Sequence, residues 1–151
     1  MSAPPILTEL KLSADMMKAV DTAFESMKPI VVSYVDENGA PQLSFRGSTQ
    51  AYSDTQLAIW VRNPEGRILE SIAKNPAMAL IYGRFEPTGR DFLIFRGRAR
   101  IDSSEAVRSQ IYEHAHAFER GQDKDRKGSA LIIDLDSVDG FFGGAQLKMR
   151  R

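Results

Sequence analysis

Alternation of apolar and polar residues with a period of two runs through the segment from Pro41 to Gln50. Leu43 and Phe45 are its apolar members, and a strand would place four polar side chains on the opposite face: Ser44, Arg46, Ser48 and Gln50. A second run, Leu57 to Arg62, is rich in the branched and aromatic residues typical of strands. The pattern predicts two strands joined by a turn, with hydrogen-bond donors along one face.

The second strand leads into a predicted helix. Asn63 and Pro64 form a helix-start signal, and the segment from Glu65 to Lys74 has the apolar spacing of a short helix. A helix start attracts anions, so we expect a phosphate pocket where the basic and hydroxyl side chains converge: Arg46, Ser48, Arg62 and Arg67. The alternative is that these arginines are ordinary surface residues and that Glu65 alone satisfies the helix dipole.

The N-terminal third predicts one helix and one hairpin. Residues 1–12 are expected to be a loose arm, and Ser13 is expected to cap a helix that continues to about Met27. The following strand, 30–35, ends at the hairpin turn signal of residues 36–39. The methionines of the predicted helix are interpreted as core or lid packing rather than as ligand-binding groups.

Two further strands are expected at residues 78–82 and 92–101, joined by a loop through Pro87-Thr88-Gly89. The second strand carries a cationic face made of Arg96, Arg98 and Arg100. We interpret this face as solvent-exposed and paired with acidic neighbours rather than as a binding site.

The C-terminal third predicts a helix over 105–120, capped by Ser103 or Ser104, and a strand over 130–135. His114 and His116 are two residues apart, which places them on different sides of that helix and argues against a shared metal. Residues 121–128 are expected to be a solvated loop, and residues 141–151 a C-terminal tail. The carboxylates beyond the last strand are interpreted as strand-end acids: Asp134, Asp136 and Asp139.

Composition narrows the class of protein. The 151 residues fit a single domain, 1–151, and contain no cysteine, which excludes disulfides and thiolate chemistry. Twenty basic and twenty acidic residues give a neutral chain, so we expect no nucleic acid partner, and no apolar run is long enough for a membrane. The first residues, 1–5, lack signal-peptide character, and we expect a cytoplasmic protein.

No nucleophile, phosphate-loop or metal motif is present, so no catalytic residue or metal ligand is assigned.

Several of these segments in order resemble the FMN-binding split-barrel family that includes pyridoxamine 5′-phosphate oxidase. The resemblance rests on the hairpin of 31–44, Arg46, the strand end 60–63, Arg67 and the segment 75–82. It implies a mainly β fold with flanking helices, a six-stranded antiparallel Greek-key split barrel, and a homodimer in which Phe141 and Phe142 fit the interface. It further implies that Arg46 and Arg67 hold an FMN phosphate and that Trp60, Val61 and Arg62 lie along the flavin, with Gln50 a weaker candidate.

Two departures from the family pattern bear on function. Ala51 and Ile68 stand where the oxidase motif has lysines, and the C-terminal segment lacks the oxidase's substrate-binding tryptophan and Arg-Leu run. Pyridoxamine phosphate oxidation is therefore not expected. The resemblance instead implies an FMN-dependent oxidoreductase acting on a small molecule, with two alternatives. One is a reductase that uses the deazaflavin coenzyme, and the other is a non-catalytic ligand-binding dimer with a degenerate flavin site.

Overall fold

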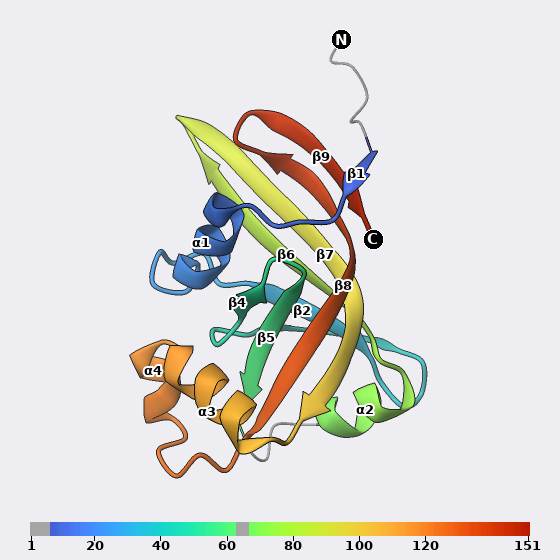
Figure 1. Cartoon of the computed structure of the whole chain (residues 1–151), viewed down its shortest axis with the longest axis vertical. Coiled ribbons are helices and arrows are strands. Elements are labelled where there is room, and N and C mark those ends of the chain that lie inside the picture. Colours follow the sequence, from blue (N-terminus) through green and yellow to red (C-terminus); the bar gives the residue numbers. More distant parts are fainter. Residues whose placement is uncertain (1–6, 63–66) are drawn as a thin grey trace.

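The computed structural model describes residues 7–62 and 67–151 of the chain (Figure 1). A single sheet dominates it, and helices pack along its sides. In chain order the strands are β1 (Leu7–Glu9), β2 (Val31–Val35), β3 (Pro41–Phe45), β4 (Gln50–Ser53), β5 (Gln56–Val61), β6 (Ala77–Glu86), β7 (Gly89–Asp102), β8 (Ser129–Phe142) and β9 (Ala145–Arg150). The helices are α1 (Ala14–Thr22), α2 (Ile68–Lys74), α3 (Glu105–His114) and α4 (Ala117–Gly121).

The sheet is built around the two 14-residue strands β7 and β8, which pair antiparallel. One path of neighbours runs β1-β9-β8-β7-β6-β2-β3. Strand β8 is long enough to take two partners on its other edge, since β5 pairs with its first half and β9 with its second half. Strand β4 pairs with β5, so a second, shorter arm of the sheet leaves β8 at this point.

The prediction of a six-stranded antiparallel barrel is therefore wrong in detail. The sheet has nine strands in the described part of the chain, it is mixed because β1 runs parallel to β9, and it does not close. Within the described residues the two ends β3 and β4 are not hydrogen-bonded to each other, and the chain simply turns from one to the other. The two arms nevertheless share one core.

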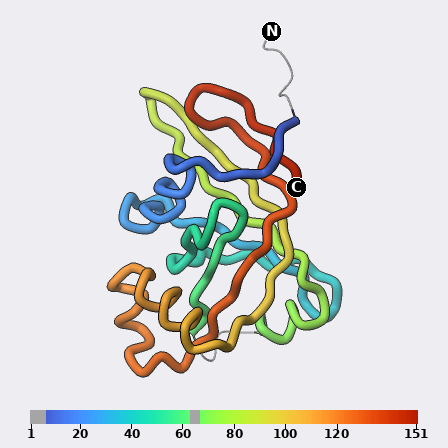
Figure 2. Tube along the Cα trace, in the orientation of Figure 1, coloured from blue at the N-terminus to red at the C-terminus, as the bar shows by residue number. Residues whose placement is uncertain are grey.

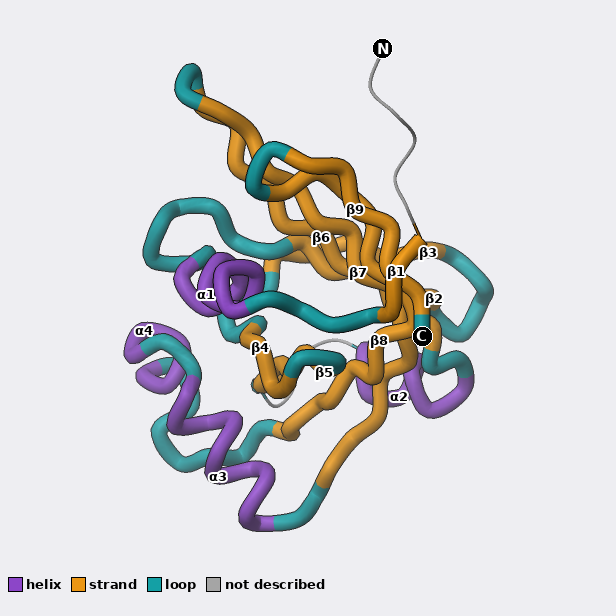
Figure 3. Tube along the Cα trace, turned by 45° about the horizontal axis from the view of Figure 1, so that its top comes forward, coloured by secondary structure: helices purple, strands orange, loops and turns teal. Residues whose placement is uncertain are grey.

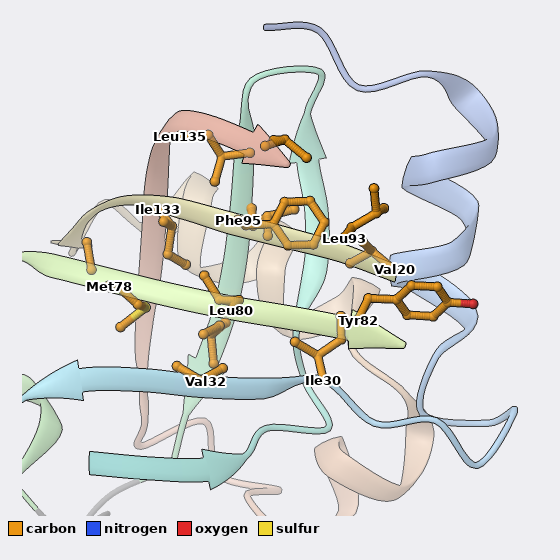
Figure 4. Packing of buried hydrophobic residues seen from close by; sticks show 14 of the residues in the cluster. Val20, Ile30, Val32, Met78, Leu80, Tyr82, Leu93, Phe95, Ile133 and Leu135 are labelled. Atoms are coloured by element: carbon orange, nitrogen blue, oxygen red, sulfur yellow. The ribbon is translucent and has the colours of Figure 1, made fainter. Parts of the chain in front are cut away.

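Side chains from both arms and from α1 fill this core (Figure 4). Phe95 and Leu93 of β7 are fully buried, and Leu80 of β6 packs beside them. A smaller cluster lies on the opposite face of β5 and β8, where Trp60 and Tyr112 bring α3 against the sheet. After Gln56, β5 is buried on both faces, and its residues 57–61 are all apolar.

Residues 7–9 of the expected loose arm 1–12, and residues 145–150 of the expected tail 141–151, are strands of the sheet (Figure 2). Residues 1–6 of that arm lie outside the described residues. Strand β1 pairs with β9, and β9 pairs with the end of β8. Leu10 and Leu12 are buried, and the Leu10 amide donates to the Arg150 carbonyl at 2.8 Å. Short-range patterns missed this pairing because its two partners are about 140 residues apart in the sequence.

Helices α1, α3 and α4 lie along one side of the molecule, and α2 lies on the other (Figure 3). Ser13 caps α1 as predicted, and Ser104 caps α3. The helix predicted to continue to Met27 ends at Thr22, where the Ala23 amide bonds to the Val20 carbonyl. Residues 23–27 form turns, which close where Met27 takes a left-handed conformation (φ 61°) and the Lys28 amide bonds to the Ala23 carbonyl. No helix in the described ranges has the length and apolar content needed to cross a membrane.

The predicted helix over 105–120 is two helices. The chain leaves helical geometry at Ala115 (ψ 152°), and α4 begins with His116 as its cap. Arg120 stabilises this break, since its guanidinium donates to the carbonyl oxygens of Glu113 and Ala115 at the end of α3.

Candidate functional site

The turn between β3 and β4 is the centre of the candidate site, and it interrupts the strand predicted over 41–50. The Thr49 amide and hydroxyl both donate to the Arg46 carbonyl, which reverses the chain. The alternation therefore does not define one face: Leu43 and Phe45 are 73% and 70% exposed, whereas Ser48 and Gln50 are 4% exposed. This turn joins the two arms of the sheet at the position where the sheet is open.

Two guanidinium groups share a small pocket beside this turn. Arg46 enters from the end of β3, and Arg62 follows the end of β5. The cavity is about 150 Å³, and its other lining residues are Ser44, Phe45, Gly47, Ser48, Trp60 and Glu119. The Arg46 Nε group donates to the Ser44 hydroxyl at 3.1 Å, which orients the guanidinium. Two cations facing one carboxylate make this pocket suitable for an anionic group.

Ser48 and Gln50 are positioned by bonds within the protein. The Ser48 hydroxyl donates to the Trp60 carbonyl (2.8 Å) and accepts from the Trp60 amide (3.1 Å), so its single proton is already used. The Gln50 side-chain amide donates to the Ile111 carbonyl at 3.0 Å and ties β4 to α3. Their hydrogen bonds thus favour a role in holding the pocket walls over direct contact with a phosphate.

Trp60 and Val61 are buried at the end of β5, with 4% and 1% exposure. The Trp60 indole donates to Asp123 at 2.9 Å. Burial alone would raise the pKa of Asp123, but hydrogen bonds from the Lys127 amide, the Trp60 indole and the Gly128 amide outweigh it and leave the pKa below its usual value. The side chain of Trp60 therefore anchors loop 121–128, although Trp60 also lines the Arg46 pocket.

Arg67 is held at a different place from the one expected. Its guanidinium donates to Glu37 at 2.8 Å, on the β2–β3 hairpin, and pairs with Glu70 at the same distance. Both partners raise the pKa of Arg67, and the hydrogen bond to Glu37 has the largest effect. The same hydrogen bond lowers the pKa of Glu37. Arg67 does not line the Arg46 pocket, and Arg62 takes its place there. The helix-start signal at 63–64 lies outside the described residues.

The two positions where the family pattern has lysine are both directed inward. Ile68 is fully buried in the main core, and Ala51 packs against that core with its amide donating to Asp21 at 2.8 Å. Their side chains therefore add no charge to the pocket.

A second pocket of about 150 Å³ adjoins the first. It shares Gly47 and Ser48 with the Arg46 pocket, and its other lining residues are Asp21, Phe24, Glu25, Thr49, Gln50, His114, Ala115 and His116. His114 Nε2 faces Asp21 at 3.4 Å. Among residues 7–62 and 67–151, no three acidic, histidine or cysteine side chains are grouped so as to hold a metal ion. Sequence reasoning missed this pocket, since its walls come from α1, β4 and the α3–α4 junction without any local motif.

The cationic face of β7 is a surface ion-pair ladder, as interpreted from the sequence. Each arginine meets a carboxylate of β8: Arg96 with Asp139 at 3.3 Å, Arg98 with Asp136 at 3.0 Å, and Arg100 with Asp134 at 2.8 Å. These pairs account for both the arginines and the carboxylate cluster without a ligand.

Comparisons of sequence give no relative: neither the protein-family models nor the curated proteins contain a match. Comparisons of structure give many. HupZ from Group A Streptococcus aligns over 90% of this chain and 98% of its own, with a TM-score of 0.67 and 15% identity. A Clostridium acetobutylicum protein related to general stress protein 26 of B. subtilis, of the pyridoxinephosphate oxidase family, aligns over 92% and 96%, with a TM-score of 0.62 and 14% identity.

Cofactor-binding proteins also share the fold. An FMN-binding protein from Syntrophomonas wolfei aligns over 83% of this chain and 86% of its own, with a TM-score of 0.62 and 8% identity. A heme binding protein from Mycobacterium smegmatis aligns over 87% of this chain and 57% of its own, with a TM-score of 0.64 and 11% identity. The structural neighbours are thus oxidase-like and FMN-binding split-barrel proteins, as the sequence resemblance implied. At these identities the likeness establishes the fold, and activity has to be argued from the site.

Proposed function

We propose that the protein binds FMN, with the phosphate in the Arg46–Arg62 pocket, and uses it in an oxidoreductase reaction on a small molecule. The observation that carries this proposal is that two arginines, Arg46 and Arg62, line one small cavity where the sheet is open. The fold supports it, since an FMN-binding protein and a protein of the pyridoxinephosphate oxidase family have the same architecture. A cytoplasmic location, as expected in the sequence analysis, is part of the same proposal.

The size of the pocket matches one end of the cofactor. A volume of about 150 Å³ accommodates a phosphate group, whereas cofactor sites usually need about 300 to 1,000 Å³. Arg46 and Arg62 would hold the phosphate through charge-assisted hydrogen bonds, and the rigid end of β5 would support the rest of the molecule. The flavin would supply the redox chemistry, so the chain has to bind, orient and shield it, which agrees with the lack of a catalytic motif.

We further propose that a second copy of the chain covers the outer face of β3, β2 and β6. Phe45, Val31 and Ile81 form one cross-strand row on this face, and the two outer members are 70% and 42% exposed. Leu43, 73% exposed, begins the next row. Phe45 also lines the Arg46 pocket, so a partner docked here would lie at the cofactor site. The proposed face thus differs from the Phe141–Phe142 contact that the sequence suggested.

Spectroscopy of the purified protein tests the flavin proposal. We expect a flavin absorption band or, after removal of any pigment, saturable quenching of FMN fluorescence. Parallel titrations with the deazaflavin coenzyme and with hemin distinguish the other cofactors found for this architecture. Saturation by either of these and not by FMN would refute the proposal.

A non-catalytic ligand-binding protein is the second candidate, and two observations favour it. Arg67 is committed to Glu37, and Ile68 is buried, so the phosphate pocket has fewer cations than the family pattern provides. Binding of FMN without reduction by NADH or NADPH, and without turnover of any acceptor, would support this candidate. Heme fits less well, since His116 Nδ1 already accepts from the Phe118 amide and His114 Nε2 faces Asp21.

A further inference from the structure

Two side chains stand directly over Gly47, the residue between Arg46 and Ser48. A methyl group added at Gly47 would come within 2.5 Å of Glu119 Oε1, on α4, and within 2.6 Å of the Phe24 ring, in the turn after α1. A side chain at this position would therefore fit only if the Glu119 carboxylate and the Phe24 ring moved aside. The segment that covers Gly47 is built from α4 and Phe24.

This cover separates the two pockets described above. Both pockets are lined by Gly47 and Ser48, one on the side of Arg46 and the other on the side of Asp21 and His114. Each has a volume of about 150 Å³. Together they reach about the lower limit of a cofactor site, whereas either one alone holds only a phosphate-sized group.

Helix α4 is held mainly by surface contacts, together with the Arg120 bonds described above and a hydrogen bond from the Tyr112 hydroxyl to the Arg120 carbonyl (3.1 Å). It has five residues, none of them buried. His116 caps it by accepting a hydrogen bond at Nδ1 from the Phe118 amide (3.1 Å). The His116 ring contacts Phe24 edge-on at 5.0 Å, and Phe118, 58% exposed, stacks on Phe24 at 5.8 Å. Elements with few buried contacts open at low free-energy cost.

We propose that α4 is a lid over the anion pocket and that unprotonated His116 is its latch. Protonation at Nδ1 replaces the acceptor with a donor, so the Phe118 amide loses its partner and the cap of α4 is lost. Movement of α4 that takes Glu119 away from Gly47 then joins the two pockets into one cleft. That this cleft admits FMN rests on the proposed function, whereas the latch itself does not.

The surroundings of His116 contain charges of both signs. The carboxylates are Asp21 and Glu25, from α1 and the turn after it, and Glu119 from α4; the basic side chains are His114 and Arg120. Imidazole is the side chain whose charge ordinarily changes between about pH 5 and 8. The lid is therefore expected to open as pH falls through this range.

Amide hydrogen exchange tests the latch on the intact protein. Protection factors for residues 117–121, corrected for intrinsic exchange, are compared at pH 8 and pH 5.5 in wild type, His116→Asn and His114→Asn. Asparagine is a good helix cap and does not titrate, so His116→Asn keeps the acceptor at both pH values. His114→Asn is the matched control, since it removes the neighbouring imidazole and leaves the cap.

We expect protection to fall by about fivefold on acidification in wild type and His114→Asn, the effect of losing one cap, and to stay constant in His116→Asn. Equal protection at both pH values in wild type, or an equal fall in His116→Asn, would overturn the latch. Phe118→Ala, at an exposed position, should speed FMN association at pH 8, and an unchanged rate would overturn the lid. If no variant bound FMN while the acid-dependent protection was present, the flavin proposal alone would fail.

Discussion

Replacing Arg46 with glutamine tests the anion pocket most directly. Glutamine keeps much of the length and some hydrogen-bonding capacity of the side chain and removes only the charge. Arg46 is oriented by its bond to Ser44 and shares the cavity with Arg62. A hydrogen bond to a charged group contributes about 1.5 to 3 kcal/mol. Since 1.4 kcal/mol corresponds to a factor of ten, the FMN dissociation constant should rise roughly 10- to 100-fold.

The assay compares FMN with riboflavin, which has the same ring and no phosphate, by fluorescence quenching at fixed ionic strength. Riboflavin affinity should change by less than about threefold, because the lost interaction is with the phosphate alone. Arg96→Gln is the matched control, since Arg96 is 55% exposed in its side chain and is paired with Asp139 away from the pocket. Arg67→Gln should resemble this control, because Arg67 is held by Glu37. Equal losses for FMN and riboflavin in Arg46→Gln, or a larger FMN loss in Arg67→Gln, would refute the assignment.

Three further predictions concern stability and assembly. Ile68→Lys should lower the free energy of unfolding, measured by chemical denaturation, by at least about 3 kcal/mol, because it removes a fully buried side chain and introduces a charge; FMN affinity should not improve. The control Ala73→Lys, at an exposed position of the same helix, should leave the stability nearly unchanged. Asp123→Asn should lower the free energy of unfolding at pH 7. Because the folded-state pKa of Asp123 lies below its unfolded value, this loss of stability relative to wild type should shrink as pH falls from about 4 through the folded-state pKa. A loss that grew on acidification would contradict the prediction. Leu43→Arg should shift the protein from dimer to monomer in sedimentation analysis, and an unchanged mass would exclude the proposed face.

Features that depend on neighbouring residues were determined by the sequence alone. Ser13 and Ser104 cap helices through amides three residues ahead, and Asp36 closes the predicted hairpin by accepting from the amides of Asn38 and Ala40. The ion-pair ladder on β7 followed from alternation within one strand, where Arg98 is an outward residue. The helix caps and the hairpin turn need only a few residues of chain, and the outward direction of the arginines needs only one strand, so the local pattern contains this information.

Features that depend on distant segments were decided by the tertiary structure. The alternation over 41–50 predicted one strand, but the chain turns within it. The apolar Leu43 and Phe45 lie on an exposed outer face and not in the core. The helix over 105–120 divided because Ala115 turns inward at the junction of α3 and α4. Apolar character predicts burial only when the element against which a residue packs is known.

The candidate site combines both kinds of information. The sequence placed four residues in an expected anion pocket, Arg46, Ser48, Arg62 and Arg67, and the resemblance added Gln50 as a weaker candidate along the flavin. Only the fold showed that the β2–β3 hairpin brings Glu37 to Arg67, while Ser48 and Gln50 satisfy main-chain groups of β5 and α3. The sequence determines which chemical group each side chain carries. The partner of that group comes from a distant segment of the chain, and the packing of the core decides which segment that is.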